Sequence, residues 1–151
     1  MQQITQGFSD SAQLVCRLIQ LQTRRLRCSA TFGQKNQLRE ELVEVFRECR
    51  ESNWDGYGSL AVSPDTFRQA FCLSAEFPPN MPAPTLSALP DGAVSMEWYH
   101  SESRQIVLSI VNGKIHYAAK LGEDRLWGRF ASIDRWPKAL LTLVRRYSQQ
   151  D

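Results

Sequence analysis

Three polar residues of the chain have side chains of the kind that acid–base catalysis uses: Asp55, Glu97 and His116. A carboxylate beside an imidazole can serve as general base and orienting partner in an RNA-cleaving site. Glu97 and His116 would form such a pair if a sheet brought them together, and Asp55 would be a carboxylate presented by a loop. Each also has a simpler structural explanation. Polar residues on a solvated sheet face need no catalytic role, and an Asp before Gly commonly accepts N–H groups of its own turn.

Motifs of the common catalytic sites are missing from the sequence. There is no Gly-rich loop before a Lys-Ser/Thr pair, no G-x-S-x-G, no H-E-x-x-H and no dinucleotide fingerprint. Asp91 and Glu97 resemble the paired carboxylates of a metal-dependent nuclease, but Trp98 and Tyr99 stand where that site needs a lysine. We therefore expect no metal and no cofactor.

The composition is that of an ordinary globular domain. The chain has 151 residues, 42% hydrophobic and 23% charged, with a net charge of +2 that does not favour wrapping of nucleic acid. No apolar run reaches membrane-spanning length, and the N-terminus lacks the apolar core of a signal peptide. Its widely spaced cysteines lack the close pairs of a zinc site, so we interpret them as reduced thiols. They are Cys16, Cys28, Cys49 and Cys72. We predict one cytoplasmic domain over residues 1–151 with no membrane association.

Apolar periodicity predicts helices in the first half of the chain and one closing helix. The predicted helices span residues 10–27, 36–52, 64–77 and 132–148. The first two would pack as a hairpin within residues 1–52, and the third follows a glycine-rich corner within residues 53–79. Ser63 is a good N-cap, with Pro64 at the first helical position. For the closing helix, we expect Ser132 or Asp134 as the cap.

Residues 84–130 alternate as an antiparallel meander sheet of four or five strands. The predicted strands span residues 85–89, 94–100, 105–111, 114–119 and, at the edge, 125–130. A two-residue turn at Asn112-Gly113 would pair Ile110 with Ile115. Trp98 joins their face only if the loop near residues 101–103 has an odd length, because a one-residue slip reverses the faces. The predicted fold class is α+β, with helices covering one face of the sheet.

A basic stripe lies on the first predicted helix. It is formed by Arg17, Arg24 and Arg27, with Arg25 at its flank. Such a stripe could dock an acidic partner protein or phosphates, although a solvated helix face is the more common reason for one. No aromatic residues interleave with these arginines, so single-stranded nucleic acid is a less favoured partner than protein.

The most distinctive local motif is Asn53-Trp54-Asp55-Gly56-Tyr57-Gly58. Its glycines and Asp-Gly step indicate a tight, irregular path. We predict a rigid corner pinned by both aromatic rings, with Trp54 buried against the helices. Asp55 should accept backbone hydrogen bonds within the loop.

The motif at residues 53–58 is followed by the helix that begins at Ser63 and Pro64, then by Pro90-Asp91-Gly92 and by Glu97-Trp98. In the order of these motifs the chain resembles a widespread family of uncharacterised bacterial proteins. The resemblance covers about residues 53–130, although Ser59-Leu60-Ala61 replaces the family's usual Ala-x-Pro step. It implies no particular activity. Because such proteins tend to belong to bacteria and mobile elements, it implies a role in conflict systems, as an antitoxin, immunity protein or inhibitor.

Two classes of function follow from the sequence. The first is a non-catalytic protein that occupies a partner's surface through its basic helices or an open sheet edge; the missing catalytic motifs favour it. The second is a small RNA- or DNA-processing enzyme, or a nucleic-acid-binding protein, that uses Glu97, His116 or Asp55. A cleft gathering these three residues would favour the second class, and a flat exposed patch the first. A homodimer is compatible with either.

Overall fold

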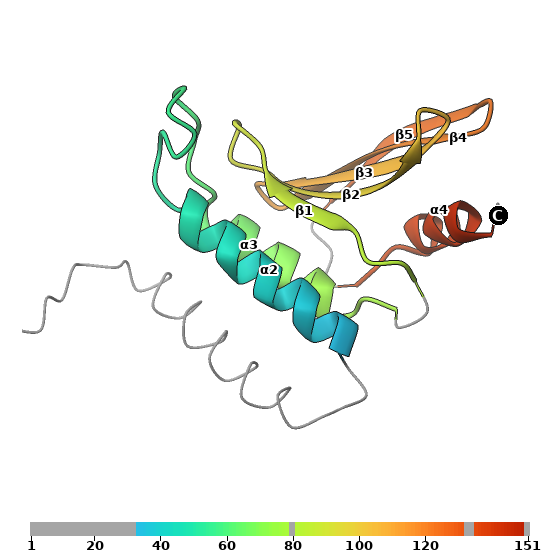
Figure 1. The fold of residues 1–151 in the computed structure, drawn as a ribbon, viewed down its shortest axis with the longest axis horizontal. Helices are drawn as coiled ribbons and strands as arrows, with labels where there is room; N and C mark the ends of the chain where they lie inside the picture. Colours follow the sequence, from blue (N-terminus) through green and yellow to red (C-terminus); the bar gives the residue numbers. More distant parts are fainter. Residues whose placement is uncertain (1–32, 79–80, 132–134, 150–151) are drawn as a thin grey trace, which may run out of the picture.

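The computed structural model describes residues 33–78, 81–131 and 135–149, and it has the α+β architecture expected from the sequence (Figure 1). In chain order the elements are α2 (Gly33–Cys49), α3 (Pro64–Ala75), β1 (Thr85–Ala88), β2 (Val94–Ser101), β3 (Arg104–Val111), β4 (Lys114–Leu121), β5 (Asp124–Ala131) and α4 (Lys138–Ser148). The predicted helix over residues 10–27, and with it the proposed hairpin, lies outside the described residues.

The helix boundaries follow local backbone chemistry. The hydroxyl of Ser63 accepts the N–H of Thr66 at 3.1 Å, so α3 begins with the predicted N-cap and with Pro64 in its first turn. The predicted end of α2 at residue 52 is wrong. The carbonyl of Cys49 accepts the N–H of Val62 at 2.8 Å, and Asn53 takes a left-handed φ of 63°, so the chain leaves the helix earlier.

The predicted start of α4 is also wrong, because Pro137 is extended, with φ −62° and ψ 139°, and the helix begins at Lys138. Just before it, the buried indole of Trp136 donates to the carbonyl of Leu73 at 2.7 Å, which draws this segment into the core. At the other end of α4, Arg104 on β3 donates to the carbonyl of Tyr147 at 2.8 Å. A cation there complements the helix dipole.

The five strands form one antiparallel sheet in the order β1-β2-β3-β4-β5. Ile110 lies opposite Ile115, as predicted from the two-residue turn. Val94 lies opposite Ile110, which places the apolar residues of β2 on the same face. A register shift between Tyr99 and Ser101 supplies the odd residue that this arrangement requires.

All three described helices lie on the same side of the sheet (Figure 1). The core between these helices and the sheet contains an aromatic cluster of Phe77, Trp98 and Trp136, whose ring centroids are 5.6–6.4 Å apart. The indole N–H of Trp98 donates to the carbonyl of Pro82 at 2.7 Å. Because each buried indole has a partner, this cluster joins sheet and helices without leaving a polar atom unsatisfied.

No described helix lies on the opposite side of the sheet. In the described ranges, we find no helix with the length and apolar character needed to cross a membrane.

Candidate functional site

The glycine-rich motif forms a loop between α2 and α3 that is held by its own polar side chains. Asp55 Oδ1 accepts the N–H groups of Tyr57 at 2.8 Å and of Ser59 at 3.2 Å, and Asn53 Oδ1 accepts that of Gly58 at 2.8 Å. The hydrogen bond from the Tyr57 N–H, with smaller contributions from Ser59, lowers the pKa of Asp55. The predicted role of Asp55 in its own turn is thus confirmed.

The two aromatic rings of this loop do not share one role. Trp54 is half-buried against the core, and its indole N–H donates to the carbonyl of Leu60 at 3.0 Å. Tyr57 is 94% exposed, so the prediction that it pins the corner is wrong. The hydrogen bonds of Asn53 and Asp55 already fix the loop, and the tyrosine ring is free to point into solvent.

The loop motif and the Pro90-Asp91-Gly92 turn meet in the fold, although more than thirty residues separate them. The N–H of Leu60 donates to the carbonyl of Pro90 at 2.8 Å. Gly92 has a φ of +83°, and a Cβ there would lie 2.7 Å from the carbonyl oxygen of Ala61. This junction requires a residue without a side chain. Both motifs therefore have a structural reason to occur together.

The candidate catalytic pair does not assemble. Glu97 lies on β2 and His116 on β4, so β3 separates them. Across the sheet, Glu97 lies in line with Val107 and Ala118, and His116 is two residues before Ala118 on β4. Two strand spacings and two residue rises put the Cα atoms of Glu97 and His116 about 12 Å apart. Asp55 uses its oxygen inside its own loop. The structure brings none of the three into contact with another.

The outward face of β4 and β5 presents a different set of side chains, which we call the basic–aromatic face. It consists of Lys114, Lys120, Arg125, Trp127 and Arg129. Trp127 is 77% exposed. Glu97 is the only acid among the outward-facing positions of the five described strands. Strand alternation puts Arg125, Trp127 and Arg129 on one face because they are two residues apart.

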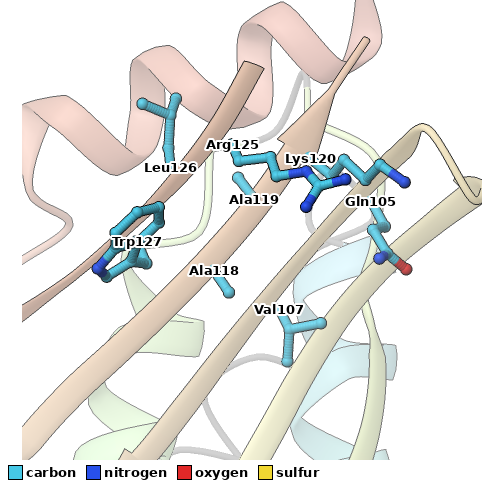
Figure 2. Close-up of a pocket in the computed structure, with 8 residues that line it drawn as sticks. All are labelled: Gln105, Val107, Ala118, Ala119, Lys120, Arg125, Leu126 and Trp127. Atoms are coloured by element: carbon cyan, nitrogen blue, oxygen red, sulfur yellow. The ribbon is translucent and has the colours of Figure 1, made fainter. Parts of the chain in front are cut away.

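Figure 2 shows how the centre of this surface is arranged. Arg125, Lys120 and Gln105 form one row across β5, β4 and β3, and Trp127, Ala118 and Val107 form the next. The small side chain of Ala118 leaves a shallow depression of about 370 Å³ beside Trp127. An apolar floor with two cations and an amide at its rim suits an anionic group carried next to an apolar one.

Two further sets of residues singled out in the sequence are the basic stripe and the cysteines. Arg17, Arg24, Arg25 and Arg27 lie outside the described residues. Of the cysteines in the described ranges, Cys49 is buried and free, and burial raises the pKa of its thiol; Cys72 is free and half-buried. No group of three or more potential metal ligands occurs within the described part of the chain.

Residues 125–130 are predicted from the sequence as an edge strand, but the outward residues of β5 are not among the predicted site residues. The signal was present in the alternation Arg125, Trp127, Arg129, because two cations and a large aromatic ring on the polar side of an edge strand have no core to enter. Comparison of the chain with family models, curated proteins and solved structures gives no match, so its function is inferred from this geometry.

Proposed function

We propose that the protein is a non-catalytic binding module that uses the basic–aromatic face to occupy an acidic surface of a partner protein. The observation that carries this proposal is the exposure of Trp127, 77%, beside Arg125 on a sheet face that no described helix covers. Tryptophan and arginine are the residues most enriched at binding hot spots, and a large exposed ring gains most when a partner removes it from water.

The arrangement of the polar residues favours binding over catalysis. Glu97 and His116 are held on strands separated by β3, and Asp55 is used by its own loop. The depression beside Trp127 is a shallow surface feature rather than a cleft that could enclose a substrate. An RNA- or DNA-processing activity would need these groups to converge on one reacting atom.

The charge of the face suggests the chemistry of the partner. Lys114, Lys120, Arg125 and Arg129 face outward against Glu97 alone, so an acidic surface is complementary. The resemblance carried by residues 53–58 suggests the setting, a bacterial or mobile-element conflict system. There the protein would act in the cytoplasm as an inhibitor, antitoxin or immunity-type protein.

Affinity capture from the native host tests this proposal. The tagged full chain should retain a specific protein, and Trp127→Ala or Arg125→Glu should reduce the retained amount by about 30-fold, the loss expected for a hot-spot residue. Lys138→Glu is the matched control, because Lys138 is an exposed cation at the start of α4, away from this face. The control should retain the same protein as the unmodified chain.

Two further arms decide between alternatives. Charge reversal at Arg17 and Arg24 tests the stripe on the first predicted helix. If it abolishes capture of the partner while the Trp127→Ala variant captures the partner normally, the sheet face is not the binding site. Loss of the cellular phenotype with Glu97→Gln or His116→Ala would favour the enzyme instead. Nuclease treatment that abolishes capture would favour nucleic acid as the partner.

A further inference from the structure

β5 is a long edge strand whose free side no described strand or helix covers. It pairs over eight residues with β4, and none of the other described strands pairs with it. Natural proteins usually shorten an edge strand, interrupt it with a bulge or proline, cover it, or place charged side chains along it. Of these devices β5 has the last, in Arg125 and Arg129, which repel a like-charged strand but not an acidic one. The opposite edge strand, β1, has only four residues, whereas β5 contains no proline and runs in unbroken register from Asp124 to Ala131. Helix packing on the sheet is mainly on β1 to β4.

The free side of β5 offers both donors and acceptors. A two-residue turn joins Leu121 to Asp124, and the pair that closes such a turn exchanges hydrogen bonds. Bonded and non-bonded pairs then alternate along the ladder, so the N–H and C=O groups of Arg125, Trp127 and Arg129 point away from β4. No described turn or loop backbone group bonds to them.

From these observations we infer that the partner binds as a sixth strand: an extended, acidic segment of the partner protein pairs with the free edge of β5. The inference rests on the proposed function and specifies how that surface is used. An incoming strand would present acidic residues to Arg125 and Arg129, with an apolar residue between them beside Trp127. Opposite charges facing each other across two strands stabilise such a pairing.

Side chains on the other face of the added strand would also have apolar side chains of β5 to contact. Leu126 points to the helix side of the sheet and is 37% exposed, and Phe130, on the same side, is half-buried and stacks on Tyr117 with ring centroids 5.4 Å apart. Apolar residues at the alternate positions of the partner strand would cover Leu126. The recognised segment therefore alternates, with acidic and aromatic residues on one face and apolar residues on the other.

The same pattern disfavours two other occupants. A second copy pairing antiparallel about Trp127, with both outward faces on the same side, would set Arg125 opposite Arg129 twice, and like charges directly opposite are destabilising. A polynucleotide backbone offers phosphate acceptors to the N–H groups but no regular donors for the exposed carbonyls. A polypeptide strand complements both.

A titration of the isotope-labelled full chain with a short blocked peptide tests the inference. The probe carries two glutamates four positions apart, a tyrosine midway between them, and valine or threonine elsewhere. The amides of Arg125, Trp127 and Arg129 should shift on binding and exchange with solvent about tenfold more slowly, as paired strand amides do. The amides of Leu126 and Gly128, which already face β4, serve as internal controls and should change little.

Control ligands and a charge swap complete the design. Two control peptides should each bind about tenfold more weakly, because cross-strand charge pairs are lost. One has the same composition but carries its glutamates on opposite faces of the strand, and the other has lysines in place of the glutamates. Arg125→Glu with Arg129→Glu should reverse that preference.

Each remaining outcome is decisive. No binding by the glutamate peptide, or binding without protection of the outward amides, would overturn edge pairing. If Trp127→Ala still abolished partner capture, the proposed function would stand and only the edge inference would fail. Tighter binding of oligothymidine at the same residues would identify a nucleic acid as the occupant and overturn the inference. A dimer that forms through these amides would do the same.

Discussion

Gly92→Ala tests the junction between the glycine-rich loop and the β1–β2 turn. Gly92 has a φ of +83°, and an alanine Cβ would lie 2.7 Å from the carbonyl oxygen of Ala61. The left-handed backbone costs a residue with a Cβ about 1–2 kcal/mol. Overpacking adds about 1–3 kcal/mol. Neither backbone can retreat freely, because the N–H of Leu60 is bonded to the carbonyl of Pro90 at 2.8 Å.

Gly56→Ala is the matched control. Gly56 has a nearly equal φ of +78°, but an added Cβ there meets no atom within 4 Å. Gly56→Ala should therefore lower the free energy of unfolding only by the backbone strain, about 1–2 kcal/mol. Gly92→Ala should lower it by a total of about 2–5 kcal/mol. In a protein of this size the latter lowers Tm by about 4–20 °C. Urea and thermal unfolding followed by circular dichroism measure both. Equal losses in the two variants would refute the close approach of Gly92 to Ala61.

Two further predictions concern the same loop. Trp54→Ala should destabilise the fold by about 1–3 kcal/mol, less than the loss of a fully buried tryptophan, because the ring is only half-buried and one hydrogen bond to Leu60 is removed; an unchanged urea midpoint would contradict this. Asp55 has a lowered pKa in the folded state, so its contribution to stability is full above the unfolded pKa, near 3.8, and falls as the pH drops through the folded pKa. The Asp55→Asn variant should therefore have a lower free energy of unfolding than the unmodified chain at neutral pH, and the two values should converge in acid when measured against pH. A difference between them that persists below the folded pKa would count against a role for the charge.

Much of the fold follows from local chemistry that a sequence displays. Asn112 and Gly113 adopt φ of 49° and 73°, the values that a two-residue hairpin turn needs, and this turn sets the register that pairs Ile110 with Ile115. Ser63 caps α3 because its hydroxyl accepts the N–H of Thr66, three residues later in the chain. Both depend on neighbours within a few residues, so no knowledge of the tertiary fold was needed.

Contacts between distant segments decided the candidate site. Glu97 and His116 share the outward face as predicted, but strand order and a two-residue offset keep them apart. Local residues also could not reveal that Tyr57 is exposed, because whether a loop aromatic is buried depends on what packs over the loop.

The amino-acid sequence by itself determined the strand alternation that puts Arg125, Trp127 and Arg129 on one side of β5, since successive side chains of a strand point to opposite faces. Only the tertiary structure decided that this side is open. The described helices all pack on the other face, where burial of apolar side chains stabilises the fold, so none of them covers the outward face of β5, where Trp127 is exposed.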